Sequence, residues 1–331
     1  MDERRPGLDP AVAEVRRAVR GVLRGIPAGS TVIVALSGGA DSLALAAAAA
    51  FEAPKLDLRA ASVTVDHDLQ EGSADAAAAA ARSAGALGLD ARVVRVDVGD
   101  AGGPEAAARD ARYRALHDAA RGAGAAALLL GHTLDDQAET VLLGLARGAG
   151  AASLQGMAEV AELDGIPLLR PLLAVRRATT RAACAAAGLV PWNDPHNADP
   201  RFARVRVRER VLPVLEAELG PGIAEALART AAQLREDAEA FDEMIDETIE
   251  DIVEHAEAGI SVSVAALAAN PAALRHRIIR HVVASEFHES LTRSQTLEVA
   301  RLVTDWSGQG PIDLPGCRAR RSGGRLEFVA R

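Results

Sequence analysis

The sequence predicts an α/β fold in which a Rossmann-like parallel sheet with helices on both faces is followed by a smaller, mainly helical C-terminal domain. Three observations predict it: β-branched runs alternate with alanine-rich stretches between residues 31 and 148, two glycines directly follow the first run, and a long helical period begins after residue 220. The chain has 331 residues, 49% apolar and 25% charged, which suits about two globular domains. We therefore expect domains at 1–219 and 220–331.

The first domain is expected to alternate strands with helices. Buried strands are predicted at 31–36, 61–65, 91–98 and 126–130. Helices are predicted at 41–52, 72–87, 104–123 and 134–147. Such alternation indicates a parallel sheet, and ligands of such sheets bind at the carboxyl ends of the strands, where the strand order reverses.

The rest of the chain has a different pattern. Residues 153–218 contain six prolines and are predicted to be irregular. In the second domain, one long helix or two close ones are predicted at 223–255, further helices at 271–285 and 292–306, and a strand at 325–329. Residues 236–257 of the first of these helices carry eleven acids and no Lys or Arg, which predicts a solvent-exposed face that repels a polyanion.

The composition excludes several classes of enzyme. Lys and Arg total 37 against 46 Asp and Glu, a net charge of −9, so a nucleic-acid partner would have to be bound by a local positive patch. Lys55 is the only lysine. Walker A ATPases, protein kinases and pyridoxal enzymes are excluded because each requires a lysine in its motif.

The two cysteines, Cys184 and Cys317, lie far apart and form no C-x-x-C motif. Two distant cysteines exclude a disulfide framework and any zinc or iron–sulfur site that could be recognised from a sequence motif. Such sparse cysteine usage fits a reducing compartment. No apolar run approaches the roughly 18 residues that a membrane span requires. We expect a cytoplasmic protein with no membrane partner.

A buried strand, two glycines and the start of a helix form the clearest local signal, between residues 32 and 43. Paired glycines let successive backbone N–H groups surround an anion, and the helix N-terminus adds about half a positive charge. Asp41 in this loop indicates a cation, Mg²⁺ or part of a substrate, between its carboxylate and a bound phosphate. The alternative is an ordinary turn in which Asp41 or Ser42 caps the helix.

The string Ser-Gly-Gly-x-Asp-Ser at 37–42 resembles the pyrophosphate loop of the N-type ATP pyrophosphatases, the PP-loop ATPases. These enzymes split ATP between the α and β phosphates and use the AMP to activate an oxygen. Residues 65–70, Val-Asp-His-Asp-Leu-Gln, are similar to the V-D-H-G-L-R of the tRNA(Ile)-lysidine synthetases, with Asp68 and Gln70 replacing its Gly and Arg. The resemblance implies ATP binding by Ser37, Gly38, Gly39, Ala40, Asp41, Ser42, Asp66 and His67, with Mg²⁺ at Asp41.

Two more segments favour the lysidine synthetase family. Residues 131–140 match its G-H-x-x-D-D-Q-x-E-T, although Asp135 and Asp136 could simply be acids at a helix N-terminus. Residues 192–208 resemble its W-x-D-x-S-N-x-D and the arginine run that follows, with His196 in place of a small hydroxyl residue. The resemblance is strong over 30–220 and continues weakly to residue 311, as in the short form with one C-terminal domain. The implied catalytic residues are Asp41, Arg112, His132, Asp136 and Glu139.

Residues 170–210 hold nine arginines against three acids, a local excess of positive charge. In an extended segment, Arg204, Arg206 and Arg208 would lie on one side and contact RNA phosphates. A belt of surface salt bridges is the alternative. The residues predicted to bind tRNA are Arg176, Arg177, Arg201, Arg204, Arg206 and Arg208, together with the C-terminal domain. Trp192 is either a stacking platform for the cytidine or a core residue.

The resemblance implies a ligase reaction on the wobble cytidine, position 34, of the CAU anticodon of tRNA(Ile). ATP adenylates the C2 oxygen and releases diphosphate, and L-lysine then displaces AMP to give lysidine, which changes decoding from AUG to AUA. We assign Asp41 and Glu139 to the lysine ammonium and place His132 and Asp136 nearer the adenylation.

Two other functions stay open at this point. One is a tRNA thiolase of the same superfamily, and the other is a noncatalytic nucleotide-binding protein that needs the loop alone. The sequence also leaves open a homodimer, the determinants of tRNA identity and the role of the acidic helix.

Overall fold

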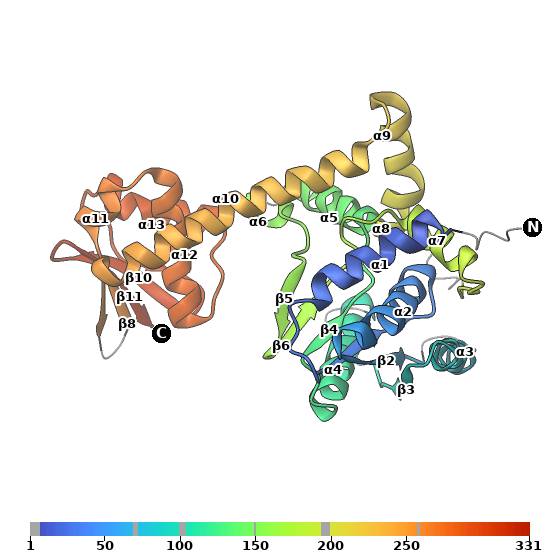
Figure 1. Ribbon diagram of the computed structural model, residues 1–331. Helices are drawn as coiled ribbons and strands as arrows, with labels where there is room; N and C mark the ends of the chain where they lie inside the picture. The colour runs from blue at the N-terminus through green and yellow to red at the C-terminus, as the bar shows by residue number, and fades with distance from the viewer. Residues whose placement is uncertain (1–6, 69–71, 99–103, 149, 193–198, 257–258) are drawn as a thin grey trace, which may run out of the picture. The chain divides into compact units, whose positions relative to one another are not determined.

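The computed structural model describes residues 7–68, 72–98, 104–148, 150–192, 199–256 and 259–331 (Figure 1). The chain forms two compact units, one ending at Leu234 and one beginning at Arg235, so the division falls within helix α10 (Ile223–Ile252). The expected boundary at 219/220 lies just before this helix and stays a prediction. Gln70 and His196, two departures from the family pattern, fall outside the described residues.

The first unit is built on a six-stranded sheet. Its strands are β1 (Thr31–Ala35), β2 (Arg59–Asp66), β3 (Asp90–Arg95), β4 (Ala127–Leu129), β5 (Val160–Leu163) and β6 (Ile166–Leu169). Their order is β3-β2-β1-β4-β6-β5, with every neighbouring pair parallel except β5 with β6. The chain therefore runs from β1 to β2 on one side and returns to β4 on the other. This reversal confirms the predicted fold and places a ligand crevice at the carboxyl end of β1.

Helices cover both faces of this sheet, because alternate residues of a strand point to opposite faces. Val32 and Val34 pack in one core with α1 and α2, which lie side by side in Figure 1, whereas Ile33 packs in another core with Leu116 of α4. The helices are α1 (Pro10–Leu23), α2 (Ala40–Glu52), η1 (Ala53–Leu56), α3 (Ser73–Ala86), α4 (Pro104–Gly122) and α5 (Leu134–Ala146). The four helices predicted for this region are confirmed within two residues; α1 and η1 were not predicted.

Residues 153–219 are more regular than the prolines suggested. Besides the hairpin of β5 and β6, this part of the chain contains α6 (Ala151–Leu154), α7 (Arg177–Ala186), α8 (Ala203–Arg206), η3 (Val207–Val211) and α9 (Leu212–Leu219). The expectation that Arg204 to Arg208 are extended is wrong. Their alternation with valine imitates a strand, but the segment is helical, and Arg204 and Arg208 lie one turn apart facing the same buried carboxylate, that of Glu139.

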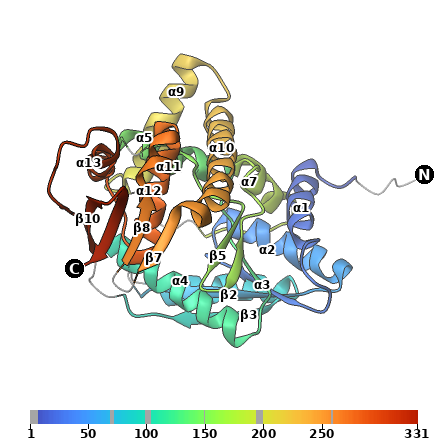
Figure 2. The same ribbon diagram turned by 90° about the vertical axis from the view of Figure 1, so that its left-hand side faces the viewer.

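The second unit combines helices with a five-stranded antiparallel sheet of order β7-β8-β11-β10-β9, and Figure 2 shows strands of this sheet beside α12. Its elements after α10 are β7 (Val253–Ala256), β8 (Gly259–Ser263), α11 (Val264–Ala269), α12 (Ala272–Phe287), α13 (Arg293–Thr304), β9 (Ile312–Asp313), β10 (Cys317–Ser322) and β11 (Arg325–Ala330). The sequence predicted β11 alone, because the other strands are short and β10 carries three arginines.

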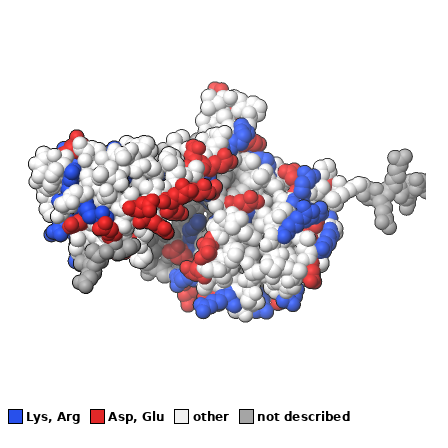
Figure 3. Space-filling model, turned by 60° about the vertical axis from the view of Figure 1, so that its left-hand side comes forward, with Lys and Arg blue, Asp and Glu red and all other residues white. Residues whose placement is uncertain are grey.

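The acidic run at 236–257 faces solvent, as predicted, although the helix predicted to reach residue 255 ends at Ile252 and the chain continues as β7. Ten of the eleven acids are described and all ten are exposed, while Ala238, Ile245 and Ile252 of α10 are buried. Figure 3 shows Asp and Glu side chains gathered in a band on this face of the molecule. The ten are Glu236, Asp237, Glu239, Asp242, Glu243, Asp246, Glu247, Glu250, Asp251 and Glu254. Among the helices of the described ranges, none has the length and apolar character to cross a bilayer.

Candidate active site

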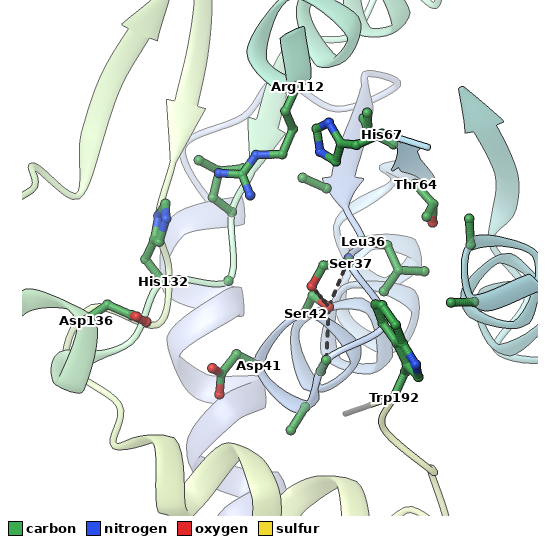
Figure 4. Close-up of a pocket in the computed structure, with 18 of the residues that line it drawn as sticks. Leu36, Ser37, Asp41, Ser42, Thr64, His67, Arg112, His132, Asp136 and Trp192 are labelled. Atoms are coloured by element: carbon green, nitrogen blue, oxygen red, sulfur yellow. Dashed lines mark hydrogen bonds between the residues drawn. The ribbon is translucent and has the colours of Figure 1, made fainter. Parts of the chain in front are cut away.

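A cavity of about 710 Å³ opens at the carboxyl ends of β1, β2 and β4, where the strand order reverses (Figure 4). Its volume is in the range of small-molecule binding sites, roughly 300 to 1,000 Å³. Among the described residues, six arginines and four carboxylates line it, an excess of positive charge in a chain of net charge −9. These charged residues are Arg109, Arg112, Arg177, Arg181, Arg204, Arg208, Asp41, Asp66, Asp136 and Glu209. The charge favours an anionic ligand.

The loop between β1 and α2 presents its backbone to this cavity. Gly38 has a φ of +82°, a left-handed conformation that glycine adopts without strain. Ser42 holds the turn: its hydroxyl accepts a hydrogen bond from the Ser37 amide at 3.2 Å and donates one to the Gly39 carbonyl at 3.0 Å. Within the described chain, the amides of residues 38–41 have no hydrogen-bond partner. These N–H groups are therefore available to an anion.

The alternative of a simple capped turn does not describe this loop. Gly39 is the N-cap residue of α2, and no side chain accepts a hydrogen bond from the first turn of the helix in the way that a capping Ser or Asp would. Asp41 lies inside the helix, where its side chain bonds to α7 instead. The first turn of α2 thus keeps its positive end open to the cavity.

Gly131 brings the start of α5 close to this loop. A Cβ on Gly131 would lie 3.1 Å from the Asp41 carbonyl and from the Ser42 amide nitrogen, tighter than ordinary contacts, so a side chain here would push the two segments apart. The next residue, His132, lines the cavity. Burial, together with the nearby Arg170 and Arg112 side chains, lowers the pKa of His132 to about 4. The imidazole is therefore uncharged at neutral pH.

Arg112 reaches from α4 into the cavity, as Figure 4 shows. No described carboxylate lies within ion-pair distance of it, and its buried Nε has no hydrogen-bond partner among the described residues. Burial lowers its pKa, with the positive charge of Arg109 contributing. His67 lies near Arg112, and its pKa is lowered by burial and by that guanidinium. A cation without a counter-ion that faces a cavity is suited to bind an anion there.

Arg177, the first residue of α7, lies among three carboxylates. Its Nη2 is 2.7 Å from an oxygen of Asp136, its Nη1 is 3.0 Å from Glu139, and its Nε is 3.5 Å from Asp41. Burial works against the charged guanidinium, but the three acids outweigh it and raise its pKa. Thr180, one turn further along α7, donates a hydrogen bond to Asp41. Arg177 therefore orients the predicted catalytic acids.

Asp41 and Asp136 line the same cavity, but their pKa values are shifted in opposite directions. Burial would raise the pKa of Asp136, but Arg177 and hydrogen bonds from the Thr133 amide and hydroxyl, both 2.8 Å, hold it below the usual value. Burial raises the pKa of Asp41 above its usual value, because Thr180 and the more distant Arg177 only partly offset desolvation. Asp41 therefore takes up a proton more readily than Asp136 does.

Glu139 is fully buried beneath the cavity and accepts from more than one arginine. The Arg208 guanidinium binds it at both oxygens, at 2.7 and 3.0 Å, and Arg177 binds one of them. Arg204 lies 3.7 Å away and donates to the Thr140 hydroxyl at 3.0 Å. Glu139 thus fixes the positions of Arg177 and Arg208, with Arg204 nearby.

The remaining predicted tRNA-binding arginines lie outside the cavity lining. Arg176 pairs with Asp135 and Glu225, and Asp135 also accepts the Arg177 amide at 2.7 Å, which caps α7. Arg201 pairs with Asp199, and Arg206 donates to backbone carbonyls of the same loop.

Comparisons with known proteins agree with this geometry. A family model described as "PP-loop domain" matches residues 13–215, and one described as "TilS substrate binding domain" matches residues 263–327. A tRNA(Ile)-lysidine synthase of Leifsonia xyli is 61% identical over 91% of this chain and 90% of its own length. One of Salinispora tropica is 55% identical over 97% of both chains.

The chain belongs to the tRNA(Ile)-lysidine synthase family. Among solved structures, the U34-tRNA thiolase NcsA from Methanococcus maripaludis has a TM-score of 0.58 and 20% identity, over 68% of this chain and 80% of that one. At this identity the likeness shows a shared fold and no more.

The structure brings most of the predicted site residues of this lysidine synthase family member to one cavity. Asp41, Asp66, His67, Arg112, His132 and Asp136 line it with the loop, while Glu139 lies behind them. Arg177, Arg204 and Arg208, predicted to bind tRNA, line the cavity too. Sequence reasoning missed Thr180, Arg181 and Arg109, which match no motif quoted for the site. Trp192 also lines the cavity, and its amide donates a hydrogen bond to the Gly38 carbonyl at 2.9 Å.

One departure from the family pattern has a structural explanation. Asp68, which replaces a glycine of V-D-H-G-L-R, has a φ of +51°, in the left-handed region. Aspartate tolerates this conformation better than most residues. Its carboxylate pairs with Arg95, and its amide donates to Asp66, 3.1 Å away. The turn after β2 is therefore kept without glycine.

Proposed function

We propose that the protein is a ligase that joins lysine to C2 of the wobble cytidine of tRNA(Ile) with a CAU anticodon, using ATP, through an adenylated cytidine. The observation that carries the proposal is the loop at 37–42 with its free amides, next to a guanidinium, that of Arg112, without a carboxylate partner. Both favour a bound polyphosphate. The names of the curated relatives support the choice of tRNA(Ile) and lysidine.

In the first step, the amides of residues 38–41 bind the departing diphosphate, and Arg112 stabilises charge that develops on the α-phosphate. The C2 oxygen of cytidine attacks this phosphorus, and the bond to the β-phosphate oxygen breaks. His132 is uncharged at neutral pH, so it acts as a hydrogen-bonding group toward the nucleotide or the base and not as a phosphate-binding cation.

In the second step, the lysine ε-amine attacks C2, the C2–O bond breaks and AMP leaves. A free lysine ammonium has a pKa of about 10.4, so the site must bind the ammonium and accept a proton from it. We propose Asp41 for both roles, because burial raises its pKa and one of its oxygens has only Arg177, at 3.5 Å, as an ion-pair partner. Glu139, first assigned to the ammonium, is proposed as the residue that positions Arg177 and Arg208, since both of its oxygens accept from Arg208.

Asp41 is also the residue proposed to hold Mg²⁺. The part of the chain that the structure describes contains no group of three or more His, Cys, Asp or Glu side chains suited to a metal. This fits Mg²⁺, which commonly binds one or two carboxylates together with substrate phosphates. When bound, the ion would neutralise phosphate charge at the loop. We further propose the cytoplasm, where tRNA is processed, as the site of action, and sedimentation would decide whether the chain is a homodimer.

Transfer of labelled lysine tests the proposed function. With ATP and Mg²⁺, the protein is expected to label tRNA(Ile) with a CAU anticodon and not the methionine tRNA with the same triplet. The Asp41→Asn variant is expected to lose lysine transfer, and its diphosphate release is expected to fall as well, because the same carboxylate is proposed to hold Mg²⁺. Equal labelling of both tRNAs, or of neither, would contradict the proposal.

The thiolase alternative lacks a suitable sulfur. Cys184 and Cys317 are both buried, and burial with the nearby Asp41 raises the pKa of Cys184 to about 11, so it is not a thiolate nucleophile at neutral pH. Changing both cysteines to alanine should leave lysine transfer intact. A noncatalytic nucleotide-binding protein would not require the buried set of Asp136, Glu139 and Arg177, and it would form no AMP.

A further inference from the structure

The first turns of α10 pack against α5, the helix that carries two of the predicted catalytic acids. Leu134 and Ala138 of α5 share a hydrophobic cluster with Ala224 and Leu227 of α10. All four residues precede Leu234, so this contact lies within the first unit. None of the four lines the cavity. The start of α10 therefore supports α5 from outside the site.

A charged link accompanies this apolar contact. Arg176, the N-cap residue of α7, forms ion pairs with Glu225 of α10 and with Asp135 of α5, the second at 3.2 Å between Nη2 and Oδ1. The other oxygen of Asp135 accepts a hydrogen bond from the Arg177 amide at 2.7 Å. One guanidinium therefore connects three helices at the point where α7 begins.

Glu225 holds Arg176 from a turn that is itself fixed. Its Oε1 accepts a hydrogen bond from the Arg176 guanidinium, whereas its Oε2 is buried and has no hydrogen-bond partner among the described residues. Glu216 fixes the turn: its carboxylate accepts hydrogen bonds from the amides of Gly222, at 2.7 Å, and Ala224, at 3.2 Å. A charge-assisted hydrogen bond from such a turn keeps the guanidinium in one place.

The link ends at Arg177, whose side chain contacts the three carboxylates described above. Asp135 fixes the backbone of Arg177, so a shift at the start of α7 would change all three of these contacts together. Neither Arg176 nor Glu225 lines the cavity. Any effect of these two residues on the reaction therefore passes through Arg177.

The surroundings of Arg176 do not suit the tRNA contact that the sequence predicts for it. Partial burial opposes its charge, but the hydrogen bond to Glu225 and the charge of Asp135 outweigh burial and raise its pKa. Two carboxylates already bind the guanidinium. A tRNA phosphate would have to displace one of them and leave it without its partner.

We propose that Arg176 and Glu225 are positioning residues for lysine transfer, which hold the start of α7, and with it Arg177, in place against the catalytic acids. This inference rests on the proposed function for the reaction that is measured. It makes the first turn of α10 part of the support of the active site, although no motif of the site includes that turn.

The rate of lysine transfer to pre-adenylated tRNA(Ile), measured against pH, tests the proposal in Arg176→Ala. The maximal rate is expected to fall about tenfold to a hundredfold, since a misplacement of about 1 Å can cost the latter. The Kd for tRNA(Ile) should not change. Because Arg177 lowers the pKa of Asp41, its displacement should also move the acid limb of the profile to higher pH. A defect in folding alone lowers the amount of active protein and does not move that limb.

Further variants separate positioning from instability. Glu225→Ala should have the same effects, and the double variant should lose no more than Arg176→Ala alone, since the two residues act as one unit. Arg176→Lys keeps the charge and should restore part of the rate. Rates are normalised to the folded fraction measured by circular dichroism. Should Arg176→Ala not fold, Glu225→Gln removes one charge without changing the shape of the side chain and carries the same expectations.

Arg92→Ala is the control. It removes an exposed arginine that pairs with an exposed acid, Asp90, at 3.2 Å on β3, so the rate and the pH profile should match those of the wild type.

Three results would overturn the proposal. One is an unmoved acid limb in folded Arg176→Ala, and another is additive losses in the double variant. The third is an unchanged maximal rate with weaker tRNA binding and a salt slope shallower by roughly 0.7 to 0.9, which would identify Arg176 as a phosphate contact. Failure of the proposed function is detected separately, by the absence of lysine transfer in the wild-type protein with all substrates present.

Discussion

The paired arginines of the catalytic cavity and Arg280 of α12 have opposite surroundings. Arg177 and Arg208 lie against Asp136 and Glu139, and their positions are fixed by these acids. Arg280 forms no ion pair with a described carboxylate, and burial and the charges of Arg277 and Arg293 lower its pKa. The comparison shows that a high density of arginine in the sequence does not by itself identify an RNA-binding surface, because most arginines of residues 170–210 neutralise nearby acids.

The same distinction holds inside the cavity. Arg177 has three carboxylates around it, whereas Arg112 has none among the described residues. A paired arginine contributes to stability and orientation, and an unpaired one remains available to substrate phosphate. Removal of the acid that pairs with an arginine should therefore lower the stability of the protein, whereas removal of the unpaired arginine should lower its activity.

The largest effect on stability is expected from Glu139→Ala. The change leaves Arg177 and Arg208 without their shared buried partner, and loss of one partner of a buried pair costs about 3 to 5 kcal/mol. Urea unfolding of the full chain measures this, with Glu218→Ala, an exposed acid of α9, as the control. A loss in Glu139→Ala no larger than in the control would show that the carboxylate does not hold the arginines.

Arg112→Ala should lower activity without lowering stability. Loss of a preorganised cation at a reacting phosphate lowers rates by about 10² to 10³-fold, so diphosphate release should fall by that factor. Stability should stay the same or rise, since a partly buried cation without a described counter-ion is removed. Arg114→Ala, an exposed arginine of the same helix, is the control. Destabilisation with unchanged diphosphate release would contradict the assignment.

A smaller effect concerns the pH dependence of stability. Because the pKa of His132 is lowered from 6.5 to about 4 by folding, the unfolded chain binds more protons between these values. The free energy of unfolding should fall on acidification through this window, by at most about 1.4 kcal/mol per pH unit. The pKa of Asp41 is raised by folding, so acidification increases the free energy of unfolding through Asp41. The contribution of His132 is therefore isolated by comparing the wild type with His132→Asn. The variant should lose less stability between pH 6.5 and 4.5; identical curves would refute a buried neutral imidazole.

The smallest effect is expected from Thr180→Val. The Thr180 hydroxyl donates to Asp41 and lowers its pKa, so its removal raises that pKa further. Lysine transfer to pre-adenylated tRNA should then decline at a higher pH on the acid side of its profile than in the wild type. Thr179→Val, whose hydroxyl has no hydrogen bond to a described residue, is the control. Identical pH profiles in Thr180→Val and the wild type would show that Asp41 does not accept the proton.

The strands and helices of residues 31–147 could be predicted because local pattern and tertiary role agree there. Four of the six residues of the run 31–36 are β-branched, and the run is buried on both faces. Gly38 adopts a left-handed conformation that glycine reaches without strain. The cavity residues of motifs 37–42 and 131–140 could be predicted from their resemblance to the motifs of a known family, and the position of each motif at the end of a strand agrees with it.

The partners of the arginines could not be predicted, because they lie on segments that are distant in the sequence. Arg177 meets Asp41 and Asp136 across 136 and 41 residues of chain, and no local pattern encodes those distances. The alternation in 204–208 suggested an extended segment, but the buried Glu139 is bound by two arginines one helical turn apart. The strands β7, β8 and β9 were missed because they are short, and β10 because it carries three arginines; all four gain stability only within their sheet.

The central claim is that a lysine-free cavity of backbone amides and unpaired arginine uses ATP to activate a tRNA oxygen. Nucleotide products formed with tRNA(Ile) test it most directly when they are counted with and without lysine. Without lysine, the account predicts a single round of diphosphate release with AMP retained on the tRNA; with lysine, it predicts continued release of both. Formation of ADP and phosphate, or no dependence of AMP release on lysine, would contradict it.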